Sequence, residues 1–146
     1  MKKYIALFLA VLMVLSMTAC GSQTTPEKYT LKLSHYRADG AQADLDAKAF
    51  AANVAAADDS LEVVIYPAAQ LGDYTTVQEL VSVGDVEMQM ATLSSTVDKF
   101  LGITSAPYIC STWDEAKAIF NRDSEFTKNI SEHLAKQNIK LLSVYP

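Results

Sequence analysis

Two histidines and a pair of adjacent serines are the first candidates for catalytic or metal chemistry in this 146-residue sequence. His35 ends an alternating polar and apolar stretch, so it is either a ligand contact or a strand-end residue satisfied by its own hydrogen bonds. His133 lies in a charged helical stretch and is interpreted as a surface residue. Neither histidine has a cysteine or glutamate at ligand spacing, so we expect no metal. Ser94 and Ser95 lack a Gly-x-Ser-x-Gly context, and we expect neither enzyme activity nor a cofactor.

Charge and cysteine content narrow the class of protein further. The chain carries 12 Lys and Arg against 17 Asp and Glu, a formal net charge of −5. No basic run is present, so we expect no nucleic-acid partner. Two cysteines cannot form a disulfide framework when one of them follows a signal segment. Cys110 lies in an apolar stretch and is expected to be a small buried hydrophobe.

The first 19 residues are typical of an export signal. Two lysines precede an unbroken apolar run over residues 5–15, which is too short to span a bilayer of about 30 Å. Small residues then lead to Cys20, a pattern that resembles the lipobox of bacterial lipoproteins, with Met17 where leucine is commoner. The resemblance implies a lipid on the Cys20 thiol and cleavage before it. The alternative is an ordinary cleaved signal with Cys20 as a bystander.

The mature chain is expected to contain one α/β domain. Residues 20–28 form a polar tether and residues 29–146 the domain. The order of elements is β-α-β-α-β-(loop)-α-α-β, which indicates a three-layer α/β fold with a mostly parallel sheet. The expected strands cover residues 29–35, 61–66, 86–92 and 139–145, and the expected helices cover residues 41–57, 73–84 and 112–121, with a last helix that begins at Asp123 or Ser124.

The stretch over residues 61–84 is the most informative part of this pattern. Its strand is β-branched and aromatic and stops before Pro67, which has no N–H for a ladder. Asp73 stands at an N-cap position, and Gly84 is placed to end the helix at its C′ position. Ligands of open α/β sheets bind beyond the carboxyl ends of the strands, where this loop lies.

Several strings in this order and spacing resemble one family. Residues 66–72 read Tyr-Pro-Ala-Ala-Gln-Leu-Gly, residues 83–88 add a glycine, an acidic residue and a short strand, and residues 106–109 and 113–116 form a Pro-aromatic segment with the helix after it. Together they look like the start of a TRAP-transporter solute-binding protein of the DctP type. The similarity runs from about Tyr29 to the end of the chain, and it implies a periplasmic-binding-protein-like lobe.

The resemblance implies what the protein binds and where. Such proteins close two lobes around a small organic acid, usually a carboxylate, outside the membrane, and deliver it to permease subunits driven by an ion gradient. By position, Tyr36 and Thr92 would contact the ligand, although some members carry an acid at the second position. Ser94 and His35 are further candidates. The string over residues 66–72 then becomes scaffold for the cleft.

Length is the main departure from the family. The second lobe and a carboxylate-binding arginine would lie beyond residues 139–145, so we expect an N-terminal lobe only, from a truncated chain. The protein would be exported and lipid-anchored through Cys20, on the outer face of the cytoplasmic membrane or in the periplasm. The alternative is a stand-alone lipoprotein lobe with a sensory or interaction role and no transport.

Overall fold

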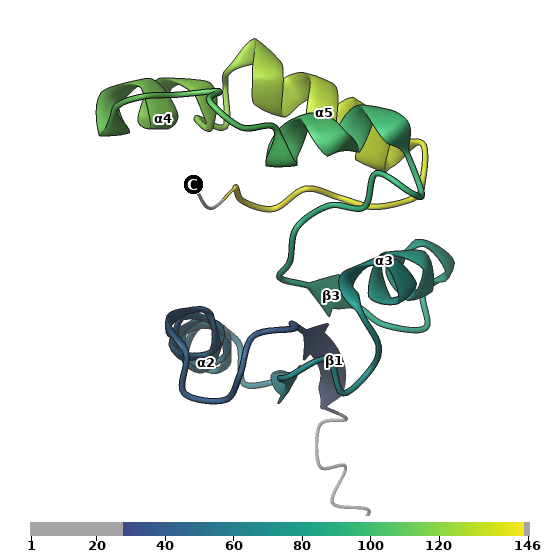
Figure 1. The fold of residues 1–146 in the computed structure, drawn as a ribbon. Helices are drawn as coiled ribbons and strands as arrows, with labels where there is room; N and C mark the ends of the chain where they lie inside the picture. Colours follow the sequence, from purple (N-terminus) through teal and green to yellow (C-terminus); the bar gives the residue numbers. More distant parts are fainter. Residues whose placement is uncertain (1–27, 145–146) are drawn as a thin grey trace, which may run out of the picture.

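The computed structural model describes residues 28–144, and the expected signal segment, Cys20 and the tether up to residue 27 lie outside them. Figure 1 shows two groups of elements, which we call the sheet region (residues 28–92) and the helical region (residues 93–144). The elements in chain order are β1 (Tyr29–Ser34), α2 (Gln42–Ala57), β2 (Leu61–Tyr66), α3 (Tyr74–Val83), β3 (Met88–Gln89), the 3-10 helix η2 (Lys99–Ser105), α4 (Trp113–Ile119) and α5 (Glu125–Ala135).

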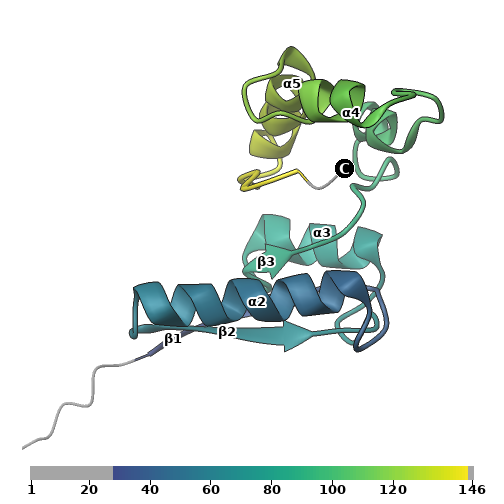
Figure 2. The same cartoon turned by 90° about the vertical axis from the view of Figure 1, so that its left-hand side faces the viewer.

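The described strands form one parallel sheet in the order β2-β1-β3. Strand β1 pairs with β2 along its full length, and its last two residues also pair with β3. The chain moves from β1 outward to β2, and then back across β1 to β3. Because such crossovers are right-handed, the two moves put α2 and α3 on opposite faces of the sheet, as Figures 1 and 2 show. The predicted three-layer α/β lobe with a parallel sheet is confirmed.

Local signals set the ends of β2 and α3 as the sequence predicts. Strand β2 stops at Tyr66, directly before Pro67. Asp73 caps α3 by accepting hydrogen bonds from the backbone N–H groups of the next turn, at 3.0 and 2.8 Å. Gly84 ends the helix with a φ of 84°, a left-handed conformation that glycine adopts at little cost.

The helical region is held by an apolar cluster and by well-formed helix caps. The Thr112 hydroxyl and the Glu115 carboxylate form the predicted capping box of α4. Ser124, the second of the two predicted candidates, caps α5. Leu101, Ile130 and Leu134 form the buried core, with partly buried apolar side chains from Leu93, Phe126, Ile139 and Leu141 around them.

The prediction of a fourth strand over residues 139–145 is wrong for its described part. Residues 139–144 have no regular secondary structure and run beneath α5 in Figure 1. Ile139 and Leu141 pack against the helical core, so this segment buries its apolar side chains without a strand partner. The third strand is also shorter than the predicted residues 86–92, since the chain leaves the sheet after the Met90 N–H donates to the Ser34 carbonyl at 2.9 Å.

Two side chains in the helical region differ from their sequence interpretation. His133 is not a free surface residue: its side chain is 27% exposed, stacks on Phe100 with ring centroids 4.0 Å apart, and has its Nδ1 atom 2.7 Å from Asp98. Cys110 carries a free thiol that is half-buried instead of fully buried. The apolar residues around Cys110 therefore mark a partly covered loop, not the core.

Candidate ligand-binding site

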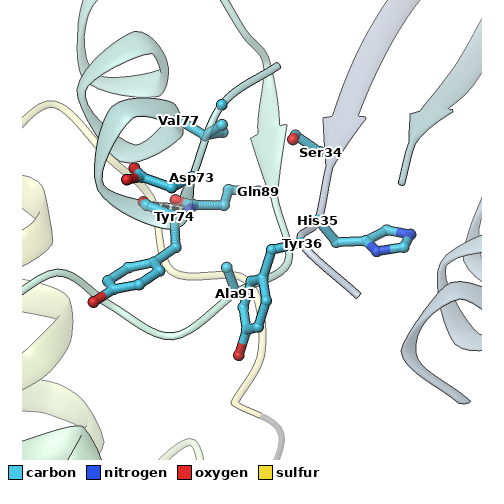
Figure 3. A pocket seen from close by; sticks show the side chains of 9 residues that line it. Ser34, His35, Tyr36, Asp73, Tyr74, Val77, Gln89 and Ala91 are labelled. Carbon is cyan, nitrogen blue, oxygen red and sulfur yellow. Dashed lines mark hydrogen bonds between the residues drawn. The ribbon is translucent and has the colours of Figure 1, made fainter. Parts of the chain in front are cut away.

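A shallow surface hollow lies beyond the carboxyl ends of β1 and β3 (Figure 3). The chain leaves β1 for β2 on one side, while β3 lies on the other, so the hollow marks the point where the strand order reverses. Ligands of open parallel sheets bind at such a switch point. The hollow is lined by Ser34, His35, Tyr36, Gly72, Asp73, Tyr74, Val77, Gln89 and Ala91.

Two residues predicted to contact a ligand meet at this edge of the sheet. The Tyr36 hydroxyl lies 3.2 Å from the Thr92 hydroxyl, and either can be the donor. Tyr36 follows β1 and Thr92 follows β3, so the parallel pairing of these strands brings together residues 56 positions apart in the sequence. Each hydroxyl can donate one hydrogen bond and accept others. The pair is thus an uncharged hydrogen-bonding group suited to polar ligand atoms.

Tyr74 is a residue of this site that the sequence interpretation missed. Its ring lies 6.1 Å from that of Tyr36, centroid to centroid, at a tilt of 55°. Its carbonyl accepts a hydrogen bond from the Gln89 side chain at 2.7 Å, drawn as a dashed line in Figure 3. The signal available in the sequence was its place directly after Asp73, the helix cap that follows the loop of β2. Two aromatic rings therefore border the hollow.

His35 lines the hollow with its backbone, while its ring points away from the hollow in Figure 3. The residue is 2% exposed, and its Nε2 atom lies 3.2 Å from the Asp44 carboxylate on α2. Of the two interpretations that the sequence left open, this geometry matches a strand-end histidine held by its own hydrogen bond. This hydrogen bond connects the chain directly before Tyr36 to α2.

Asp44 is a fully buried carboxylate with three polar neighbours. It accepts from the Lys48 ammonium at 2.7 Å and from the Gly40 N–H at 2.8 Å, in addition to facing His35. The Lys48 hydrogen bond, followed by those of Gly40 and His35, holds the pKa of Asp44 well below its usual range, despite its burial. Lys48 also pairs with Asp39 at 2.7 Å, and the two carboxylates raise the pKa of Lys48. This charged network fixes the loop between β1 and α2.

Ser94 lies behind the site and joins two elements. It is fully buried, and its hydroxyl lies 2.9 Å from that of Thr75 on α3. Its backbone N–H donates to the Gln78 side chain at 2.7 Å, and the Gln78 amide donates to Gln137 at 2.9 Å. Ser94 does not line the hollow. Its contacts link α3 to the chain after β3 and, through Gln78, to the helical region.

The turn after β2 clamps the loop that carries Tyr36. The Ala68 N–H donates to the Arg37 carbonyl at 2.8 Å, and the Ala69 N–H donates to the His35 carbonyl at 3.1 Å. Both alanines have a positive φ, 52° and 58°, which turns these two N–H groups toward the loop after β1. A left-handed alanine costs roughly 1–2 kcal/mol, so the clamp stores strain where the site is built. Ala68 and Ala69 of the Tyr-Pro-Ala-Ala-Gln-Leu-Gly string thus support the loop after β1, while Gly72 at the end of the string lines the hollow.

The part of the chain that the structure describes contains neither a metal-binding cluster nor a membrane-spanning helix. Over residues 28–144, no three His, Cys, Asp or Glu side chains gather closely enough to hold a metal ion. Within the same residues, no helix is both long enough and apolar enough to cross a membrane.

A three-layer lobe with a hollow at its switch point is typical of ligand-binding proteins of the periplasmic type. Residues 33–146 match the family described as bacterial extracellular solute-binding protein, family 7, also called DctP. The chain belongs to this family, whose members are extracytoplasmic and take part in transport. No curated protein sequence matches the chain.

Solved structures support the same assignment. The chain is similar to a TRAP periplasmic solute-binding protein from Haemophilus influenzae with bound L-gulonate, with a TM-score of 0.68 and 26% identity over 78% of this chain. It shares its fold with a TRAP periplasmic solute-binding protein from Roseobacter denitrificans with bound 3-deoxy-D-manno-oct-2-ulosonic acid, with a TM-score of 0.64 and 23% identity over 80% of this chain. The match covers 38% of each of these proteins.

Proposed function

We propose that this protein captures a small organic acid outside the cytoplasm as the solute-binding component of a TRAP-type transporter. The observation that carries the proposal is the Tyr36–Thr92 hydroxyl pair, which lies at the switch point of a family 7 lobe. The two solved relatives hold L-gulonate and a deoxy-octulosonic acid, which are both carboxylic acids with several hydroxyl groups. Hydroxyl pairs suit such ligands, because each can donate to one ligand oxygen and accept from another.

The contacts at the hollow support binding without catalysis. Tyr36 and Thr92 would exchange their mutual hydrogen bond for bonds to the ligand, and the ring of Tyr74 would pack against its carbon chain. The chain is then not an enzyme, and no cofactor is needed. His35 and Ser94 would hold the strand ends in place behind the contacts.

The proposal includes where the ligand goes. The protein would hand the acid to the membrane permease subunits of the transporter, which use an ion gradient for uptake. A lipid on Cys20 would hold the protein at the outer face of the cytoplasmic membrane or in the periplasm, because acyl chains keep a small domain at a membrane surface. The family membership and the signal-like first 19 residues support this placement.

Thermal unfolding of the full chain with a panel of acids tests the proposal. The panel contains L-gulonate, the deoxy-octulosonic acid, a C4-dicarboxylate and a 2-oxo acid. At a ligand concentration of 100 times the Kd, binding adds about 2.7 kcal/mol to the folded state, so the unfolding midpoint rises. We expect at least one acid to raise it, and a flat response across the whole panel would contradict the proposal.

Two matched variants assign the effect to the site. Tyr36→Phe removes the hydroxyl that faces Thr92 and is expected to reduce the ligand-induced shift. Tyr29→Phe makes the same change at the opposite end of β1, where the side chain is 65% exposed, and should leave the shift unchanged. Equal shifts in both variants would place the binding elsewhere on the protein.

A further inference from the structure

Helix α3 is the helix of the sheet region that lies nearest the helical region in Figures 1 and 2. Its residues Thr75, Gln78 and Ser82 are spaced at i, i+3 and i+7, so they share one face of the helix. The Thr75 hydroxyl lies 2.9 Å from the Ser94 hydroxyl, and the Ser82 carbonyl accepts from the Asn138 side chain at 3.4 Å. A polar stripe on α3 therefore joins the two regions.

Gln78 is the buried centre of this stripe. It is 1% exposed, and both ends of its side-chain amide are hydrogen-bonded. Its Oε1 atom accepts from the Ser94 N–H at 2.7 Å, and its Nε2 atom donates to the side-chain oxygen of Gln137 at 2.9 Å. Gln137 donates in turn to the His133 carbonyl of α5 at 3.3 Å. One side chain thus holds both the first residues of the helical region and the end of its last helix.

This polar contact differs from the packing inside the helical region. Over the described residues, the apolar cluster of the helical region includes no residue before Leu93. On the side of the sheet region, Val77 is the buried apolar residue of α3, and it lines the hollow. Water can replace hydrogen bonds when a polar contact opens, whereas opening an apolar core exposes its surface to water. The boundary between the regions should therefore open before either region unfolds.

The boundary lies next to the candidate site. Thr92, whose hydroxyl is 3.2 Å from that of Tyr36, is the second residue before Ser94. The Met90 N–H, just before it, donates to the Ser34 carbonyl of β1 at 2.9 Å. Because β3 has only two residues, the chain at Thr92 is held by this bond on one side and by the contacts of Ser94 with α3 on the other.

We infer that the helical region turns away from the sheet region as a unit about residues 90–93, and that Gln78 is the latch that holds it closed. The closed latch keeps Thr92 beside Tyr36, and its opening separates the two hydroxyl groups. Gln78 is then a positioning residue that acts on the site through Ser94. The inference goes beyond the proposed function, because it rests on contacts within the chain and not on what the hollow binds.

Substitutions of Gln137 open the latch from the far side. Gln137→Ala removes the acceptor of the Gln78 Nε2 atom and leaves the bond from Ser94 to Gln78 possible. Gln137→Met keeps the length of the side chain without its amide, so an effect seen in both variants comes from the lost hydrogen bond and not from lost volume. Glu79→Ala is the matched control, because it truncates the exposed neighbour of Gln78 on α3.

Residue-resolved amide hydrogen exchange of the full chain, measured without ligand, tests the inference. We expect both Gln137 variants to speed the exchange of the Ser94 and Met90 amides by about tenfold or more, because these amides are freed when the latch opens. The His35 amide, which pairs with β2, and the Phe120 amide at the end of α4 should keep their parent rates, since both regions stay folded. Glu79→Ala should change none of the four rates.

Four results would overturn the inference. Parent rates at Ser94 and Met90 in both Gln137 variants would show that the stripe does not hold the regions together. Equal acceleration of all four amides would show unfolding of the whole chain, and an effect of Gln137→Ala without one of Gln137→Met would assign it to packing. An equal effect of Glu79→Ala would remove the special role of the latch. None of these results involves a ligand, so the proposed function is tested separately by the panel of acids.

Discussion

The sheet region and the helical region of this protein are stabilised in different ways. The fully buried large side chains of the helical region include the apolar residues Leu101, Ile130 and Leu134, which form one cluster. In the sheet region the corresponding side chains are mostly polar, namely Ser34, His35, Asp44 and Gln78, with Val77 as the apolar exception, and the buried Ser94 lies just past the end of this region. The polar set lies at the carboxyl end of the strands or directly behind it.

This difference indicates a division of roles. Apolar burial is non-directional and stabilises a fold without fixing any one group tightly. Buried hydrogen-bonded networks are directional, and each member constrains its neighbours. The helical region therefore contributes stability, while the sheet region uses part of its interior to position the loop that carries Tyr36 and Arg37. The following experiments test this comparison.

The largest effect is expected in the apolar cluster of the helical region. Leu134→Ala removes a side chain that is 1% exposed, and such truncations cost about 2–5 kcal/mol. Leu142→Ala makes the same substitution where the side chain is 64% exposed, and should change stability by about 0.5 kcal/mol or less. Urea unfolding of both variants measures the difference.

Hydrogen exchange adds a regional readout to this pair. In Leu134→Ala, the amides of α5 and η2 should exchange faster than those of β1 and β2, because the cluster joins the first two elements. Equal acceleration in both regions would show that they unfold as one unit. Equal stability losses in the two leucine variants would contradict the assignment of the core.

A smaller effect is expected at the turn that leads into α3. Gly72 has a φ of 124°, and a Cβ added there would lie 2.9 Å from the Thr76 methyl carbon. Gly72→Ala should therefore lower the free energy of unfolding by about 2–3 kcal/mol, because the backbone strain and the close contact with Thr76 both destabilise the folded state. Gly40 has a φ of 78° with open space around it, so Gly40→Ala should cost only about 1 kcal/mol.

A second substitution separates the two causes at Gly72. Thr76→Ser removes the methyl group that an alanine at position 72 would contact. In a Gly72→Ala background it should restore part of the lost stability, measured by urea unfolding, while it should do little in the parent chain. The same loss with and without the methyl group would assign the whole effect to backbone strain.

The elements predicted correctly from the sequence are those with local signals. Pro67, Asp73 and Gly84 fix the end of β2 and both ends of α3, and the Thr112–Glu115 pair opens α4. Each signal acts within a few residues of its own position. The prediction of a fourth strand was wrong because a strand also needs a neighbouring strand to pair with. Residues 139–144 have the composition of a strand, but they pack on the helical core instead.

The candidate site was only partly predictable for a related reason. Tyr36 and Thr92 were proposed through family resemblance, because the spacing of two residues 56 positions apart does not predict that they are in contact. Tyr74 was missed because its position directly after a helix cap does not by itself indicate a ligand contact. The His35–Asp44 pair was not predicted, because a histidine at the end of a strand and an aspartate in a helix nine residues later do not form a sequence motif. Tertiary pairing, not local pattern, determines all three.

The smallest expected effect concerns how stability depends on pH. Lys48 and the Gly40 N–H hold the pKa of Asp44 below its ordinary value of about 4, and His133 and the Phe100 N–H lower the pKa of Asp98 in the helical region. A carboxyl group with a lowered folded-state pKa stabilises the fold fully above its unfolded pKa and loses this contribution as pH falls toward the folded value.

The parent chain should therefore lose stability between about pH 5 and pH 3. Asp44→Asn removes one such contribution, so its stability should fall less over that interval, and Asp98→Asn should flatten the curve to a lesser degree because Asp98 is 23% exposed and partly hydrated. Urea midpoints at several pH values measure both slopes. If the stability of Asp44→Asn fell as steeply with pH as that of the parent chain, the buried network around Asp44 would not contribute to the stability of the sheet region. The contrast between a sheet region held by polar networks and a helical region held by an apolar cluster would then be wrong.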